Sequence, residues 1–219
     1  MTQGYFRDLL EGNPALLAEI VRFNLSGREQ DSRPEGAHAL ALQNHPEVLE
    51  ALRRRTKQPA RAGFWGFAAV PERLALLPPA ELSQLGRMAA AAVCADELAG
   101  LLTRADVEAA REAIGADTLH WALVRGRFLI GTLAADLRTA SGDAPLIEKL
   151  ERLPRGLIAG VAEGWPEALR EAAAPRLAAM DLPEAAPIVL DADLRRRTCH
   201  FIRKLIYREL DAKWTPYFD

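Results

Sequence analysis

Helix start signals and apolar stripes crowd residues 76–128, and they constrain the fold more than any other part of this chain. Pro78-Pro79 precedes a run in which apolar residues recur at intervals of three and four, the spacing of one helix face. The members of this stripe are Leu82, Leu85, Met88, Ala89, Ala92 and Val93. We therefore predict a helix that begins at the two prolines and buries this face.

Two further helices are predicted after it. Thr103 stands three residues before Asp106, a spacing typical of a capped helix N-terminus. Gly115 follows the next apolar run, at the position where a helix commonly ends in a left-handed residue. The third helix is then expected to begin at Asp117 or Thr118.

The composition favours helix elsewhere as well. Ala, Leu, Arg and Glu dominate and β-branched residues are sparse, whereas residues 186–190 form a strand-like run too short to build a sheet. With 49% hydrophobic and 26% charged residues, 219 residues suffice for one domain with a substantial core. We predict an all-α fold, a single compact domain over residues 1–219 with about eight to ten helices and irregular N-terminal loops. A small N-terminal subregion, 1–70, is the alternative division.

The remaining boundaries follow from prolines, glycines and caps. In the N-terminal part we predict a helix from Asn13-Pro14 to about Ser26, a loop over 27–37 and a short helix after 44–46. After the central helices we predict a continuous helix over 127–139, ended by Ser141-Gly142, and a short helix over 145–153. A kinked helix over 154–180 with breaks at 164–166 and Pro175, a connection over 181–190, and a last helix from Asp191 or Asp193 to about Lys213 complete the chain.

Three aromatic residues, Phe64, Trp65 and Phe67, lie between Gly63 and Pro71. Their spacing does not fit an amphipathic helix, so we expect the segment to cross the surface and insert aromatic side chains into the core.

The two cysteines, Cys94 and Cys199, each fall within an apolar helical stripe. Buried free thiols are the preferred interpretation and a disulfide is the alternative. The first residues lack the plan of a signal peptide, and no apolar run approaches the length of a membrane span. We therefore expect the protein in the cytoplasm.

No recognisable active site emerges from the sequence. Phosphate-binding glycine motifs are absent, and the glycines of 128–133 and 156–164 fall in helical patterns that favour close helix packing. Cys199 and His200 are adjacent, so on a helix they point in different directions. The four histidines, at positions 38, 45, 120 and 200, are too scattered for a metal site. We predict a protein that is not an enzyme and has no catalytic residue, cofactor or metal ion.

The last predicted helix is the richest candidate for an interaction. Its expected buried stripe is Leu194, Thr198, Phe201, Ile202, Leu205, Ile206 and Leu210. Its other faces carry the basic residues Arg195, Arg196, Arg197, Arg203, Lys204 and Arg208. These side chains form either a solvated face or a docking surface for an acidic protein. A nucleic-acid-binding regulator is a further alternative, although the chain as a whole carries a formal charge of −2.

The C-terminal tail holds Trp214, Tyr217 and Phe218. Aromatic residues dominate binding hot spots, so we treat these three as partner-binding candidates. Folding of the tail back onto the domain is the alternative.

The order of these elements resembles a known family. An L-P-x-x-x-L-x-x-L-G helix comes first, followed by an apolar helix ending in E-L, a short R-x-x-V-x-x-x-R-x-x-I-G helix and an A-L-containing helix. The pattern is similar to that of SctK proteins, the YscK/PscK family of the bacterial type III secretion machine. It covers about a quarter of the chain, through Leu77, Pro78, Leu82, Leu85, Gly86, Leu98, Arg104, Val107, Arg111, Ile114, Gly115, Ala122 and Leu123.

The resemblance implies a non-enzymatic cytosolic adaptor of the secretion sorting platform. SctK proteins link the cytoplasmic domain of the inner-membrane ring protein SctD to SctQ, and SctQ leads through SctL to the ATPase SctN. Membrane association would then be peripheral, through SctD, with neither membrane insertion, nucleic acid nor small-molecule substrate. A rival hypothesis is a helical ligand-binding protein or enzyme with a buried pocket lined by His120, Trp121 and Arg125.

Overall fold

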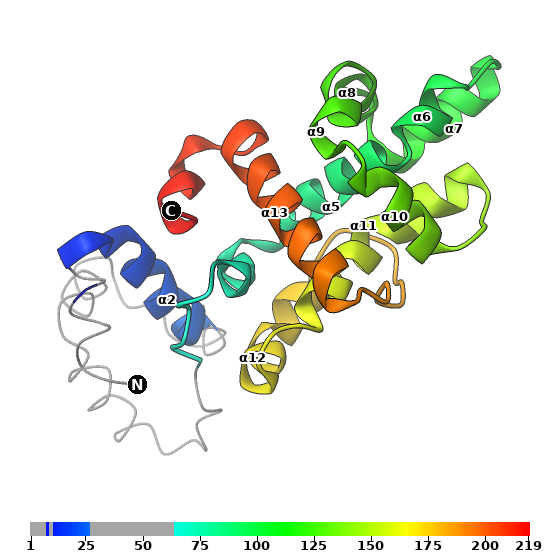
Figure 1. Ribbon diagram of the computed structural model, residues 1–219. Helices are drawn as coiled ribbons and strands as arrows, with labels where there is room; N and C mark the ends of the chain where they lie inside the picture. The colour runs from blue at the N-terminus through cyan, green and yellow to red at the C-terminus, as the bar shows by residue number, and fades with distance from the viewer. Residues whose placement is uncertain (1–7, 9–10, 27–63) are drawn as a thin grey trace.

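The computed structural model describes residue 8 and residues 11–26 and 64–219 (Figure 1). Across this part of the chain every regular element is helical and none is a strand, which confirms the all-α prediction. The predicted loop at 27–37 and the predicted short helix after 44–46 lie outside the described residues.

The central element is α5, Pro79–Val93, which begins at the two prolines as predicted. It contacts α11, Leu146–Ala162, most extensively, and it also contacts α10, Leu133–Ser141, and α13, Ala192–Glu209. The predicted apolar stripe of α5 is buried throughout, and even Ser83 and Gly86 are buried. The helix is thus enclosed on nearly all sides, and Figure 1 shows the other helices arranged around it.

Helix α11 continues through Pro154, so the predicted end of a short helix near Leu153 was wrong. A proline inside a helix costs about 3 kcal/mol because it removes one hydrogen bond and crowds the preceding turn. On both sides of it, Leu150, Leu157 and Val161 are at most 2% exposed. Burying each such side chain contributes about 1.5–3 kcal/mol, so the continuous apolar face outweighs the proline.

The next elements are α6, Ala95–Ala99, α7, Arg104–Ile114, and α8, Ala116–Trp121. The predicted cap of α7 is confirmed, because the backbone N–H of Asp106 donates to Thr103 Oγ1 at 3.1 Å. Gly115 ends α7 with a φ of 87°, but its ψ of 149° is extended rather than left-handed helical. This residue is also the N-cap of α8, which therefore begins one residue earlier than predicted.

The predicted continuous helix over 127–139 was wrong. The chain forms a π-helical turn, η2, at Ala122–Gly126, then the short α9, Arg127–Ile130, and then α10. Gly131 separates the last two with φ 56° and ψ −137°, a conformation that only glycine adopts without strain. This glycine makes a turn and has no neighbour within 4 Å of an added Cβ, so it does not serve close helix packing.

After the turn at 164–166, α12 spans Glu167–Ala178 and contains Pro175 within it. The connection 181–190 has no regular structure, as predicted, and lies across the glycine face of α11. The backbone N–H of Ile188 donates to Gly156 O at 3.0 Å, and a Cβ at Gly160 would lie 2.5 Å from Ile188 O. The α11 glycines therefore admit an extended backbone strap, where the sequence had suggested a second helix.

Buried Arg155 holds the same strap. Its guanidinium donates to the carbonyl oxygens of Leu177, Met180, Leu182 and Pro183 at 3.0–3.1 Å. One side chain thereby fixes the end of α12 and the start of the connection to α11.

The last long helix, α13, begins after Asp191, whose carboxylate accepts from the Leu194 backbone N–H at 2.8 Å. Its predicted stripe is buried from Leu194 to Ile206 and half-buried at Leu210. The helix ends at Glu209, four residues short of the predicted Lys213, and the tail forms the 3-10 helix η3, Ala212–Tyr217.

The described N-terminal residues pack against this tail. Helix α2, Pro14–Ser26, contacts η3 and the 3-10 helix η1, Val70–Leu76. Phe67 is fully buried and meets the rings of Phe23 and Phe64 edge-on, at centroid distances of 5.4 and 5.1 Å. The prediction that the segment at 64–67 supplies core anchors is confirmed.

Candidate functional site

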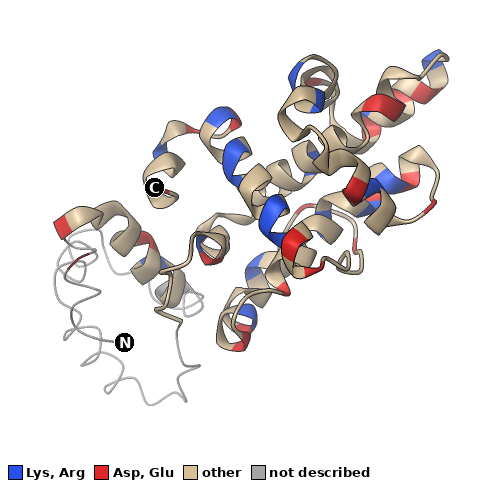
Figure 2. Cartoon of the chain, in the orientation of Figure 1, with Lys and Arg blue, Asp and Glu red and all other residues tan. Residues whose placement is uncertain are grey.

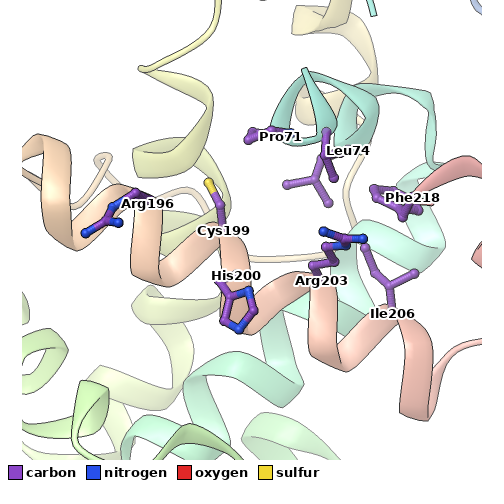
Figure 3. Close-up of a pocket in the computed structure, with 9 residues that line it drawn as sticks. Pro71, Leu74, Arg196, Cys199, His200, Arg203, Ile206 and Phe218 are labelled. Carbon is purple, nitrogen blue, oxygen red and sulfur yellow. The ribbon is translucent and has the colours of Figure 1, made fainter. Parts of the chain in front are cut away.

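A hollow of about 170 Å³ lies between α13 and η1 (Figure 3). Three residues of η1, five of α13 and one of the tail form its wall. They are Val70, Pro71, Leu74, Arg196, Cys199, His200, Arg203, Ile206 and Phe218. Figure 3 shows Cys199 and Arg203 extending from α13 toward η1. Two of the predicted partner-binding arginines therefore border an apolar depression.

Arg203 is half-buried at this border. One of its terminal nitrogens donates to the hydroxyl of Tyr207 at 3.2 Å, and its guanidinium lies 5.4 Å from the centre of that ring. Its Nε is buried and has no hydrogen-bond partner among the described residues. The bond to Tyr207 uses one of the five N–H groups of this guanidinium, so its terminal nitrogens retain further donors.

Cys199 supplies part of the wall and is a free thiol, as predicted, but it is half-buried where full burial was expected. Burial raises the pKa of this thiol to about 11, while Arg195 lowers it by a smaller amount. Near neutral pH the side chain is therefore a neutral, weakly polar group. Cys94 is likewise free and fully buried in the core.

The charge of α13 is strongly positive, with six Lys or Arg against two Asp or Glu. Figure 2 shows these basic residues along the helix. Because the whole chain carries −2, the positive charge is a local property of this helix. Such a local field favours negatively charged partners within a Debye length of about 10 Å at moderate salt.

Two of the basic residues of α13 form contacts within the chain. Arg195 points inward and donates to the carbonyl oxygens of Gly160 and Leu190, so it secures the strap. Arg197 forms ion pairs with Asp136 and Asp193 at 2.7 and 2.8 Å.

Three basic side chains of the same helix remain exposed: Arg196, Lys204 and Arg208. Arg196 pairs with Asp193 at 2.5 Å, an exposed contact within one helix turn. The hydrogen bond from Arg196 lowers the pKa of the Asp193 carboxyl. A partner can approach these three side chains directly from solvent, whereas Arg203 is half-buried at the edge of the hollow.

The C-terminal tail folds back onto the domain, which is the alternative to exposed partner-binding aromatic residues. Trp214 and Phe218 are 6% and 1% exposed, and Tyr217 is half-buried. Trp214 Nε1 donates to Glu81 of α5 at 3.2 Å. Arg73 of η1 donates to the carbonyl oxygens of Tyr217 and Asp219 at 3.0 and 2.8 Å. Of these aromatic residues, Phe218 reaches the hollow, as part of its wall.

The residues of the pocket hypothesis differ in burial. Trp121 is 8% exposed and its ring packs on Gly126, where an added Cβ would lie 2.7 Å from Cζ3. His120 and Arg125 are exposed, and Arg125 contacts Glu209 of α13 at 3.5 Å. None of the three lines the hollow described above.

A second hollow of about 470 Å³ lies between α5, α7, α11 and the strap. Its rim carries Glu112, Glu151 and an ion pair of 3.1 Å between Arg87 and Asp181. The three carboxylate residues are exposed, so this hollow is bordered by solvated charges. None of the predicted partner-binding residues lies in it.

The η1 wall was missed by sequence reasoning. Val70, Pro71 and Leu74 follow the aromatic segment that was read as a core anchor, and they meet α13 more than a hundred residues later in the chain. Pro71 bounds that segment in the sequence, but no local pattern indicates which part of the chain the following residues contact.

No known protein-family model, curated protein or solved structure matches this chain. Within residues 11–26 and 64–219, no three His, Cys, Asp or Glu side chains gather as a metal site requires. Over the same residues, no helix combines the length and apolar character needed to cross a bilayer.

Proposed function

We propose that this protein is a non-enzymatic cytosolic adaptor of a bacterial type III secretion sorting platform, with SctD and SctQ as its partners. In this role it binds both proteins at separate surfaces and reaches the inner membrane only through SctD. SctL and SctN are then connected to it indirectly, through SctQ.

The resemblance to SctK proteins supports the family assignment. Its motif residues fall on the central scaffold: Leu82, Leu85 and Gly86 lie on α5, and Ile114 ends α7. At Gly86 the backbone of α11 lies so near that an added Cβ would be 2.6 Å from Pro154 O. The motif residues therefore stabilise the helical scaffold that carries the exposed surfaces, and an adaptor needs such a scaffold to hold its binding surfaces in place.

The observation that carries the docking proposal is the exposed basic surface of α13. Arg196, Lys204 and Arg208 are exposed, and Arg196 also borders the hollow, whose wall includes apolar side chains. Burial of apolar side chains supplies binding affinity, and complementary charge raises the association rate and fixes the register of the complex. A protein partner whose surface carries both apolar and acidic side chains meets both requirements.

This arrangement also separates the proposal from nucleic-acid binding. Arg195 and Arg197 are committed to contacts inside the chain, so the basic helix does not present an unbroken cationic row. A helix that neutralises many phosphates needs those charges free.

The test is binding of purified SctD cytoplasmic domain and SctQ from the same bacterium, measured by calorimetry. The variant Lys204→Glu with Arg208→Glu reverses two exposed charges and should weaken one partner by at least about tenfold, a loss of ~1.4 kcal/mol. Lowering the salt concentration should strengthen that same interaction in the wild type.

Arg104→Glu is a control charge reversal on another helix. Arg104 is exposed at the first position of α7, where an acidic residue is favourable for the helix, and Figure 1 shows α7 apart from α13. Its affinities for both partners should equal those of the wild type. If neither partner binds the wild-type chain, the adaptor proposal is overturned, and salt-dependent binding to duplex DNA would favour the nucleic-acid alternative.

A further inference from the structure

The hollow between α13 and η1 has the size of one side chain. An apolar cavity of about 150 Å³ holds a benzene molecule, whereas pockets for drug-sized ligands span about 300–1,000 Å³. At about 170 Å³, this hollow admits a single leucine or aromatic side chain. Its volume therefore favours an anchor residue over a free metabolite.

The walls of the hollow suit an apolar anchor. Leu74 and Ile206 are buried beneath it, Val70 is half-buried at its edge, and Phe218 closes one end. The thiol of Cys199 completes the wall on the α13 side. Burial of an apolar group against such a surface is favourable in proportion to the area removed from water.

Two arginines make the rim of the hollow cationic on the α13 side. Arg196 and Arg203 are seven residues apart, so they lie on one side of the helix, with the imidazole of His200 between them. Lys204 and Arg208 are exposed further along the same helix, outside the lining of the hollow. The nearest acidic group on this helix, Asp193, is already bound to Arg196 and Arg197.

We propose that the hollow receives one apolar side chain from an acidic segment of a partner protein, and that Arg196 and Arg203 bind the flanking carboxylates. The inference deepens the proposed function, on which it rests, by naming the chemistry of the segment that docks at α13. Guanidinium groups suit this role because each presents several donors in a plane that matches a carboxylate. Beyond the bond to Tyr207, the terminal nitrogens of Arg203 carry further N–H groups that can donate to a carboxylate.

A labelled probe peptide tests this chemistry directly. In the probe, a leucine lies between two pairs of glutamates, and fluorescence anisotropy reports its binding to the full chain. Replacing the leucine with serine, or the glutamates with lysines, should weaken binding at least about tenfold. Equal affinity for the leucine and serine peptides would overturn the proposed anchor, and equal affinity for the lysine peptide would overturn the charge requirement.

Cys199 provides a second readout within the same chain. Its alkylation rate, measured by mass spectrometry, should fall at least about tenfold when the probe is saturating. Cys94 is 0% exposed, so its slow alkylation reports global opening and should not change. An unchanged rate at Cys199 under saturating probe would place the peptide elsewhere and refute the proposal.

The variants Arg203→Gln and Arg104→Gln form a matched pair, since each removes one positive charge. Only Arg203→Gln should weaken binding of the probe peptide, by at least about tenfold. The alkylation rate of Cys94 checks that the variant remains folded. When SctD or SctQ binds but leaves Cys199 alkylation unchanged, the inference fails and the adaptor function stands. When neither protein binds but the probe protects Cys199, the adaptor function fails and the docking chemistry stands.

Discussion

Replacement of Gly86 by alanine tests how closely the two central helices pack. The added Cβ would lie 2.6 Å from the carbonyl oxygen of Pro154 and 3.0 Å from its carbonyl carbon. Ordinary contact at a Cβ begins near 3.4 Å, so the backbones of α5 and α11 must move apart by about 0.8 Å. Because the obstructing atoms are backbone of a buried helix, no side-chain rotation relieves the contact.

The magnitude follows from two opposing effects. Overpacking a core costs about 1–3 kcal/mol, and the upper value applies where backbone obstructs the new group. Alanine is a better helix former than glycine by about 1 kcal/mol, which offsets part of the loss. Gly86→Ala should therefore lower the free energy of unfolding by about 2 kcal/mol, which is about 4–8 °C in Tm for a chain of this size.

Urea denaturation followed by circular dichroism measures this change, with Gly100→Ala as the control. Gly100 has an ordinary φ of −86°, and the nearest atom to an added Cβ is Glu97 O at 3.5 Å. That variant should be neutral or gain about 0.4–1 kcal/mol from reduced freedom of the unfolded chain. If Gly86→Ala proves as stable as the wild type, the close approach of α5 and α11 is refuted.

Three further perturbations address other contacts. Arg155→Met leaves four carbonyl oxygens without their donor, so it should lose about 3 kcal/mol and accelerate hydrogen exchange around residues 177–183, whereas unchanged exchange would contradict the clamp. Trp214→Ala removes a buried ring and its bond to Glu81, so calorimetry should record a loss of about 3–5 kcal/mol, and a near-neutral effect would mean that the tail is not docked. Burial raises the pKa of Cys94 from 9.0 to about 12, so the folded state keeps a proton that the unfolded state releases. Stability should therefore fall as pH rises above 9.0, and Cys94→Ala should flatten that fall in urea titrations at several pH values; an identical slope would refute the assignment.

Local signals in the sequence predicted the helices well. Thr103 and Asp191 have side chains that suit an N-cap, and each accepts the backbone hydrogen bond that this role requires. The period of apolar residues in α13 identified its buried face from Leu194 to Ile206. These features depend on residues within one or two turns, which is the range over which a single sequence is informative.

The wrongly predicted helix boundaries lie where local sequence signals do not reveal the tertiary contacts or the backbone turn. Pro154 is a helix-ending signal, yet it lies within α11 because the apolar face on both sides is buried against α5. The helix break at Gly131 was not predicted, because the apolar residues keep their helical spacing across this position although the backbone turns there. A single glycine in a helical pattern does not distinguish close packing from a break.

The candidate site was predicted in part. The sequence indicated that α13 would carry exposed basic side chains, and Arg196, Lys204 and Arg208 are exposed. It did not reveal that Arg195 would bind backbone carbonyls or that η1 would form the opposite wall of a hollow. Both depend on segments that meet only in the folded chain, so periodicity along one helix contained no information about them.

Simultaneous binding of the two proposed partners tests the adaptor account most directly. The full chain is mixed with SctQ and the cytoplasmic domain of SctD, and light scattering after size-exclusion chromatography measures the mass of the complex. The account predicts one species containing all three proteins, from which Lys204→Glu with Arg208→Glu removes a single partner and Arg104→Glu removes none. Failure of both partners to bind the wild-type chain, or mutually exclusive binding of the two, would contradict it.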